Sequence, residues 1–221
     1  MDKEIYSSSQ LIDFILEIGF LPLLNSGING FCAELIVSPD CRYTQFEDGG
    51  WDWPLWKWKG DIIRSGNIVY GKFFNKKAGF ISLNFWPEFC NYRRSKNVNL
   101  SNDAVEQTIL EIVQFNGAML VADIRKQCGF GGEKMRHTFD SYISKLQQRC
   151  LLVTEDFVYK KDRHGRDYGW GSAVVNTPEK LYGKENCISN NSPSKSFEIM
   201  ANHLKDKFPQ FTMQQISKLL G

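Results

Sequence analysis

The segment from Ser101 to Asn176 constrains the fold more than any other part of the chain, because helical patterns give way to strand patterns in a fixed order. The first three patterns have the apolar spacing of helices, and the last two are rich in bulky residues that favour strands. These five patterns cover 101–117, 121–127, 133–149, 151–160 and 168–176. The sequence therefore predicts a helix, a short helix, a longer helix and a β-hairpin with Gly165 in its turn.

This order is typical of a winged helix-turn-helix, in which the third helix can enter the major groove of DNA and the hairpin lies along the backbone. We therefore predict an α+β protein with a winged helix at 99–183. An α+β region (1–98) with a hairpin precedes it, and a loop with two closing helices (184–221) follows. An alternative stays open, in which the N-terminal region is a degenerate second winged helix.

The N-terminal region contains the elements that this alternative needs. Ser9 and Gly19 are cap residues for a helix over 10–19, and a short helix is expected near 57–65. Two strands are expected at 68–74 and 78–85, and the polar stretch 91–99 is interpreted as a linker. The closing helices are expected at 196–207 and 212–220.

Charge is distributed unevenly along the chain although the formal total is only +2. Residues 1–50 carry 2 basic and 8 acidic side chains, whereas residues 51–100 carry 9 basic and 3 acidic ones. Such asymmetry can mark a binding face. It can equally mean that the two segments pack together and neutralise each other.

Aromatic residues make up 14% of the chain, and four of the six Trp residues lie at Trp51, Trp53, Trp56 and Trp58. With Lys57 and Lys59 between and beside them, these rings could stack on unpaired bases. We favour packing in the core, because clustered aromatic side chains contribute large buried surfaces.

Basic side chains supply the candidate contacts to phosphate groups, which give affinity without sequence specificity. They lie on the first hairpin, in the expected linker, on the third helix and at the tip of the second hairpin. The candidates are Arg64, Lys72, Lys76, Lys77, Arg93, Arg94, Lys134, Arg136, His137, Lys145, Lys160, Lys161, Arg163, His164 and Arg166.

Several classes of protein are not indicated. The N-terminus lacks the order of a secretory signal, no apolar stretch is long enough to span a membrane, and the six Cys residues form no CxxC pair. We therefore expect a cytoplasmic protein with reduced thiols. No His or Cys pair has the spacing of metal ligands, and no phosphate-binding glycine loop is present, so we expect no metal and no cofactor.

Two blocks of the sequence resemble a bacterial family, the AlkZ-related proteins. One block contains Trp56-Lys-Trp-Lys-Gly-Asp-Ile-Ile-Arg, Tyr70-Gly-Lys-Phe-Phe, Ala78-Gly-Phe-Ile-Ser and Phe89-Cys-Asn-Tyr-Arg-Arg. The other runs from Phe157-Val-Tyr-Lys-Lys-Asp-Arg-His-Gly-Arg-Asp-Tyr-Gly-Trp-Gly to Thr177-Pro-Glu. The family is distantly similar to AlkZ-type DNA glycosylases, which are built from tandem winged helices. The resemblance implies this fold and a context of DNA repair.

Catalysis does not follow from the resemblance. AlkZ-type enzymes use a short Gln-x-Gln or Gln-x-Asp motif to position water, and the nearest string here is Gln45-Phe46-Glu47. We interpret it as a chance match, so Gln45 and Glu47 are weak catalytic candidates and enzymatic activity is left open. We predict a protein that binds duplex DNA. The alternatives are a module that binds a protein partner or a second copy of itself, and an active glycosylase on alkylated or crosslinked DNA.

Overall fold

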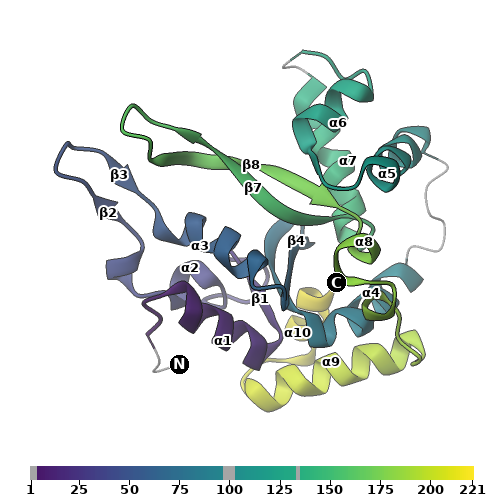
Figure 1. Ribbon diagram of the computed structural model, residues 1–221. Helices are drawn as coiled ribbons and strands as arrows, with labels where there is room; N and C mark the ends of the chain where they lie inside the picture. The colour runs from purple at the N-terminus through teal and green to yellow at the C-terminus, as the bar shows by residue number, and fades with distance from the viewer. Residues whose placement is uncertain (1–3, 97–102, 133–134) are drawn as a thin grey trace.

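The computed structural model describes residues 4–96, 103–132 and 135–221 and shows two sets of elements in the same order (Figure 1). The first set consists of α1 (Ser8–Ile18), β1 (Phe20–Pro22), α2 (Ala33–Ile36), α3 (Pro54–Arg64), β4 (Ile68–Phe74) and β5 (Lys77–Ser82). Between α2 and α3 lie the short helix η1 (Pro39–Cys41) and the small hairpin β2 (Thr44–Gln45) and β3 (Trp51–Asp52).

The second set repeats this order further along the chain. It consists of α5 (Ala104–Asn116), β6 (Met119–Leu120), α6 (Val121–Gln127), α7 (Arg136–Gln148), β7 (Val153–Lys161) and β8 (Asp167–Asn176). Each set is followed by helical elements. These are η2 (Leu83–Phe85) and α4 (Trp86–Ser95) after the first set, and α8 (Pro178–Tyr182), η4 (Glu185–Cys187), α9 (Pro193–Lys207) and α10 (Met213–Leu220) after the second.

A single antiparallel sheet joins the two sets. Within the described residues it has six strands in the order β1-β5-β4-β7-β8-β6, so that the short strand of each set pairs with the second strand of its own hairpin. The two halves meet where β4 and β7 pair through Tyr70 and Thr154. The expectation of an α+β protein is confirmed.

Buried hydrophobic residues form two clusters, which coincide only in part with the two sets of elements. The larger cluster joins α1, α3 and the first hairpin to α4, α9 and α10, so the C-terminal helices pack on the N-terminal elements. The smaller cluster is formed by α5, α6, α7 and the bases of β7 and β8, around Ile109, Phe139 and Leu146. Figure 1 shows α5, α6 and α7 gathered at one end, opposite α1, α9 and α10.

Several helix ends follow local rules. Gly19 and Gly117, both with positive φ, follow the last residues of α1 and α5, as predicted. The N-cap of α1 is Ser7 instead of Ser9, and the Ser7 hydroxyl accepts a hydrogen bond from the Gln10 N–H. Asp103 caps α5, and Ser101, with which the predicted helix 101–117 begins, lies outside the described residues.

The expected linker at 91–99 is wrong for its first half, because α4 continues through Ser95. Trp86 and Pro87 begin this helix instead of ending a strand, and the expected strand to residue 85 stops at Ser82. Pro is favoured in the first turn of a helix, where its missing N–H has no partner to lose. α4 packs along α9, which begins at Pro193 instead of Ser196.

The Trp cluster is divided between core and surface. Trp53, Trp56 and Trp58 pack against the larger hydrophobic cluster, as the core interpretation predicts. For Trp51 this interpretation is wrong: its side chain is 69% exposed, because it lies on the small hairpin that extends away from the sheet.

Candidate nucleic-acid interface

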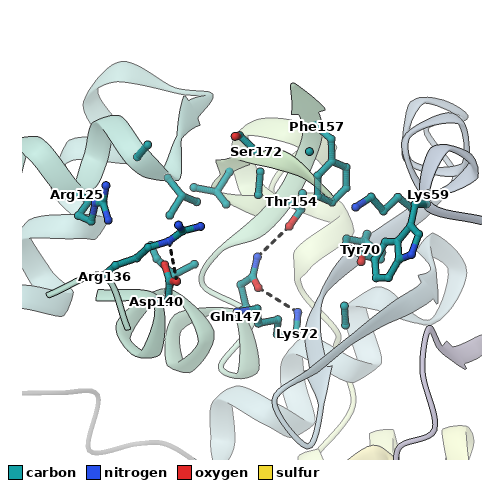
Figure 2. Close-up of a pocket in the computed structure, with 18 of the residues that line it drawn as sticks. Lys59, Tyr70, Lys72, Arg125, Arg136, Asp140, Gln147, Thr154, Phe157 and Ser172 are labelled. Carbon is teal, nitrogen blue, oxygen red and sulfur yellow. Dashed lines mark hydrogen bonds and ion pairs between the residues drawn. The ribbon is translucent and has the colours of Figure 1, made fainter. Parts of the chain in front are cut away.

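A cleft of about 570 Å³ lies where the two halves of the sheet meet. Its walls come from α3 and β4 of the first set and from α6, α7, β7 and β8 of the second. Figure 2 shows that side chains of α6 and α7 lie on one side of the strands, and Lys59 and Tyr70 on the other. Basic side chains outnumber acidic ones among the described residues that line it: Lys59, Lys72, Arg125, Arg136 and Lys160 against Asp140.

Alternation along β4 places Lys72 in this cleft. Residues two apart in a strand face the same side, so Tyr70 and Lys72 line the cleft while Val69 and Phe73 are fully buried in the larger cluster. The Lys72 ammonium donates a hydrogen bond to the Ser144 hydroxyl of α7 at 3.0 Å. Because this partner is neutral, the positive charge of Lys72 is not compensated by it and can attract a phosphate group.

Gln147 of α7 connects the helix to both halves of the sheet. Its Oε1 accepts a hydrogen bond from the Lys72 backbone N–H at 3.1 Å, and its Nε2 donates to the Thr154 hydroxyl at 3.0 Å (Figure 2). Its side chain is buried, and buried hydrogen bonds of this kind fix geometry because leaving either partner unsatisfied is costly. Gln147 thus holds α7 against the floor of the cleft.

The opposite wall presents two arginines from neighbouring helices. Arg125 of α6 is half-buried, and Arg136 begins α7 and is exposed. The Arg136 Nε lies 3.9 Å from the Asp140 Oδ2, a distance and exposure at which an ion pair contributes little. Each guanidinium group can therefore donate two parallel hydrogen bonds to a phosphate group.

Lys59 of α3 contributes the only buried basic side chain of the cleft lining within the described residues, at 2% exposure. Its ammonium lies 3.8 Å from the ring centre of Phe157 and 4.6 Å from that of Trp56. Burial lowers the pKa of Lys59 to about 7, because desolvation disfavours the charged form.

We expect Lys59→Met to stabilise the protein at acidic and neutral pH. The unfolded lysine binds a proton up to a pH near 10.5, whereas the folded one releases it near 7, so the stability of the wild type rises with pH between these values. Below pH 7 the full cost of the buried charge is present, and we expect a gain on the order of 3 kcal/mol at pH 6.

Urea unfolding of wild type and Lys59→Met at pH 6 and pH 9.5 measures this effect. The gain should shrink toward the higher pH. A gain that is equal at both values, or a loss at pH 6, would contradict a buried charge at this position. Lys57→Met is the matched control, since Lys57 lies on the same helix, is 39% exposed and pairs with Asp52.

The tip of the β7–β8 hairpin is largely neutralised by carboxylates. Arg166 lies 2.8 Å from both Asp48 and Asp162 and stacks on the Phe46 ring, so the tip contacts the small hairpin. Partial burial opposes ionisation of Asp162, but hydrogen bonds from Arg166 and His164 outweigh it and lower its pKa to about 2.

Two further basic residues of the tip, Lys161 and His164, are also near acidic groups. Lys161 pairs with Asp167 at 2.5 Å, His164 lies 3.5 Å from Asp48, and the Arg163 Nε donates to the His164 ring. Lys160, at the start of the tip, faces the cleft instead. The structure therefore separates Lys160 from the other predicted residues of this hairpin.

Basic candidates outside the cleft make intramolecular contacts. Arg64 pairs with Asp61 and Asp156, both at 2.7 Å. Arg93 donates to the Phe73 carbonyl, and Arg94 donates to the Cys150 carbonyl and to Glu179.

Four further candidates lie on two other elements. Lys76 is exposed in the turn between β4 and β5, and the ammonium of the neighbouring Lys77 donates to the Asn25 carbonyl at 2.6 Å. On α7, His137 is exposed and Lys145 lies 3.9 Å from Glu106. Lys134 lies outside the described residues. Among the candidates that the structure describes, it thus brings Lys72, Arg136 and Lys160 alone into the cleft.

The weak catalytic candidates lie elsewhere. Gln45 is the last residue of β2 and Glu47 follows in the turn, and both are exposed and do not line the cleft. Within the described parts of the chain, no three His, Cys, Asp or Glu side chains are grouped closely enough to hold a metal ion. None of the helices described there has the length and apolar character needed to cross a bilayer.

Two residues of the cleft were not among the nucleic-acid candidates. From the sequence, Lys59 is predicted only as a neighbour of the Trp cluster, and no prediction is made for Arg125. The sequence does contain an indication for Lys59. A lysine next to a cluster of Trp residues is expected to place its ammonium near aromatic rings. Arg125 carried no comparable signal, since its helix alone does not indicate which partner it faces.

The fold and the cleft together define an α+β protein in which two sets of elements share one antiparallel sheet and enclose a basic cleft at their junction. Comparison with protein families matches residues 5–221 to the family described as AlkZ related. The chain belongs to the AlkZ-related family, and this membership suggests a relation to DNA-repair glycosylases. Searches among curated proteins and among solved structures gave no match.

Proposed function

We propose that the protein binds duplex DNA through two winged helices that share one sheet, and that it does so without the glycosylase motif. The order of helix, short strand, short helix, helix and hairpin occurs twice, and in each case the short strand pairs with the second strand of the hairpin. This repetition supports the tandem alternative. The relation to AlkZ through the family supports DNA as the partner.

The observation that carries the proposal is the basic cleft. Lys72, Arg125, Arg136 and Lys160 come from four different elements and face one hollow that holds a single carboxylate among its described lining. A concave surface lined by one sign of charge focuses the field and attracts phosphate. The tip of the β7–β8 hairpin contributes less in this proposal, since carboxylates already neutralise most of it.

Titration of a fluorescent duplex at several salt concentrations tests the proposal. Each neutralised phosphate contributes about −0.9 to the slope of log affinity against log salt, so we expect a slope of roughly −3 to −4 from the four exposed or half-exposed cleft cations. Sequence should matter little, because contacts to phosphate do not read bases. No measurable binding at low salt would overturn the proposal.

A further inference from the structure

Lys59 lines the cleft as a buried side chain, and its ammonium lies among the rings of Trp56, Phe157 and Tyr159. Figure 2 shows its amine directed toward Phe157 and the interior of the cleft. Because burial lowers the pKa of Lys59 to about 7, the neutral amine is populated at neutral pH. A neutral amine in a desolvated site is the form of lysine that attacks carbonyl carbons.

The internal repeat shows that packing alone does not require a lysine here. Gly66 and Cys150, both in the left-handed conformation, follow α3 and α7. The strand residues that pair across the junction, Tyr70 and Thr154, each lie four positions later. Seven positions before Gly66 and Cys150 lie Lys59 on α3 and Ile143 on α7, and Ile143 also lines the cleft. An apolar side chain therefore fills the equivalent place.

The opposite side of the cleft offers cations to a ligand that carries phosphate. Arg125 and Arg136 form that wall, and Lys72 lies on the strands between it and Lys59 (Figure 2). Lys160 of β7 also lines the cleft. The volume of about 570 Å³ lies within the range of pockets that hold small molecules or single nucleotides. One side of the cavity can therefore bind phosphate, and the amine on the other side can react with a carbonyl carbon.

We propose that this cleft takes the ring-opened sugar of an abasic site in DNA, and that the Lys59 amine forms an imine with its aldehyde carbon. The assignment deepens the proposed function and rests on it, because DNA is the source of the phosphates that the arginines hold. An unpaired position in a duplex can leave the helix at lower cost than a paired base, which would let the sugar reach the cleft.

The reaction needs no co-reactant. The lone pair of the neutral Lys59 nitrogen adds to the aldehyde carbon, a carbon–nitrogen bond forms, and the carbonyl electron pair moves to oxygen, which takes a proton. The first proton of the nitrogen goes to this oxygen and gives a carbinolamine. The nitrogen then gives its second proton to the hydroxyl group, which leaves as water as the carbon–nitrogen double bond forms, so amine and aldehyde give imine and water. Arg125 and Arg136 orient the sugar by binding its flanking phosphates and take no part in the bond changes.

Trapping with sodium borohydride tests the assignment, because hydride converts the imine into a stable amine that joins protein to DNA. We expect a covalent adduct on a denaturing gel when wild type meets a duplex with one abasic site, and none with the undamaged duplex. Lys57→Met should form the same adduct. Lys59→Met and Lys59→Arg should both lose it, and peptide mass analysis should place the link on Lys59.

A small phosphorylated aldehyde, glyceraldehyde 3-phosphate, serves as a second probe under the same conditions. Adduct formation with this compound but not with abasic DNA would overturn the DNA assignment in favour of a small metabolite. Equal trapping in wild type and both Lys59 variants would show that exposed lysines react instead, and would overturn the role of Lys59.

Binding of the undamaged duplex separates this inference from the proposed function. If wild type binds that duplex with the expected salt dependence but forms no adduct with abasic DNA, the imine is wrong and the DNA-binding function stands. If it binds no duplex at all, the proposed function fails first. Thermal melting of each variant shows whether a lost adduct reflects lost folding, and Lys59→Arg keeps a basic group in place without an amine that can form an imine.

Discussion

The double variant Arg125→Glu, Arg136→Glu is expected to bind duplex DNA about 100-fold more weakly than wild type at moderate salt, because two phosphate contacts become repulsive. Both side chains reach solvent at the cleft wall, so the fold should be unaffected. Arg136 lies 3.9 Å from Asp140, four positions later on the same helix. The variant therefore places two carboxylates at this spacing, which costs a few tenths of a kcal/mol.

Fluorescence anisotropy at several salt concentrations measures this effect. The slope of log affinity against log salt should become shallower by about 2, one unit for each lost contact. The matched control is Lys195→Glu, Lys218→Glu, which makes the same change in net charge at exposed positions of α9 and α10. An equal loss in this control would show that only total charge matters, and would argue against the cleft as the interface.

The second large effect is expected for Glu106→Ala. The Glu106 side chain of α5 is 1% exposed, and its Oε2 lies 2.5 Å from the Arg149 guanidinium just after α7. Lys145 adds a second, longer contact at 3.9 Å. Removing one partner of a buried ion pair leaves the other charge uncompensated, and because the Arg149 side chain is 22% exposed we expect a cost of about 3 kcal/mol, the lower end for such pairs.

For a chain of this size such a loss lowers the melting temperature by roughly 10 °C. We expect the smaller hydrophobic cluster to be most affected, because α5 and α7 are two of the helices that build it. Thermal melting with Glu111→Ala as control, an exposed carboxylate on the same helix, measures the difference. A change below 1 kcal/mol in Glu106→Ala would show that the pair is not a structural link between the helices.

Local patterns predicted most elements of the second set, because short-range chemistry decides them. Gly117 and Gly165 mark a helix end and a hairpin turn through their own backbone freedom. α4 was missed for a physical reason. Its buried face begins with Trp86, Phe89 and Cys90, but the next position on that face is Arg93. The Arg93 guanidinium lies over the Phe89 ring and donates to the carbonyl of Phe73. A charged residue thus interrupts the apolar stripe that identifies a helix.

The candidate site was predicted less well than the fold. Lys72, Arg136 and Lys160 were expected to contact DNA and do line one cleft, although their role in binding stays a prediction. Arg93 and Arg94 have the same residue type but bind backbone carbonyls of neighbouring elements. Sequence cannot separate these cases, because a guanidinium suits a carbonyl oxygen as well as a phosphate oxygen.

The sequence by itself determined the α+β class, the order of helices and hairpin in the second set, and the resemblance to the AlkZ-related family. The class and the order of elements depend on residue type and on spacing between residues that are near in the sequence. The resemblance depends on distinctive runs of residues. Only the tertiary structure decided that β4 pairs with β7, and that pairing brings Lys59 and Arg125 to one cavity. The pairing joins residues 84 positions apart, and no local pattern encodes a contact whose stability comes from packing between distant segments.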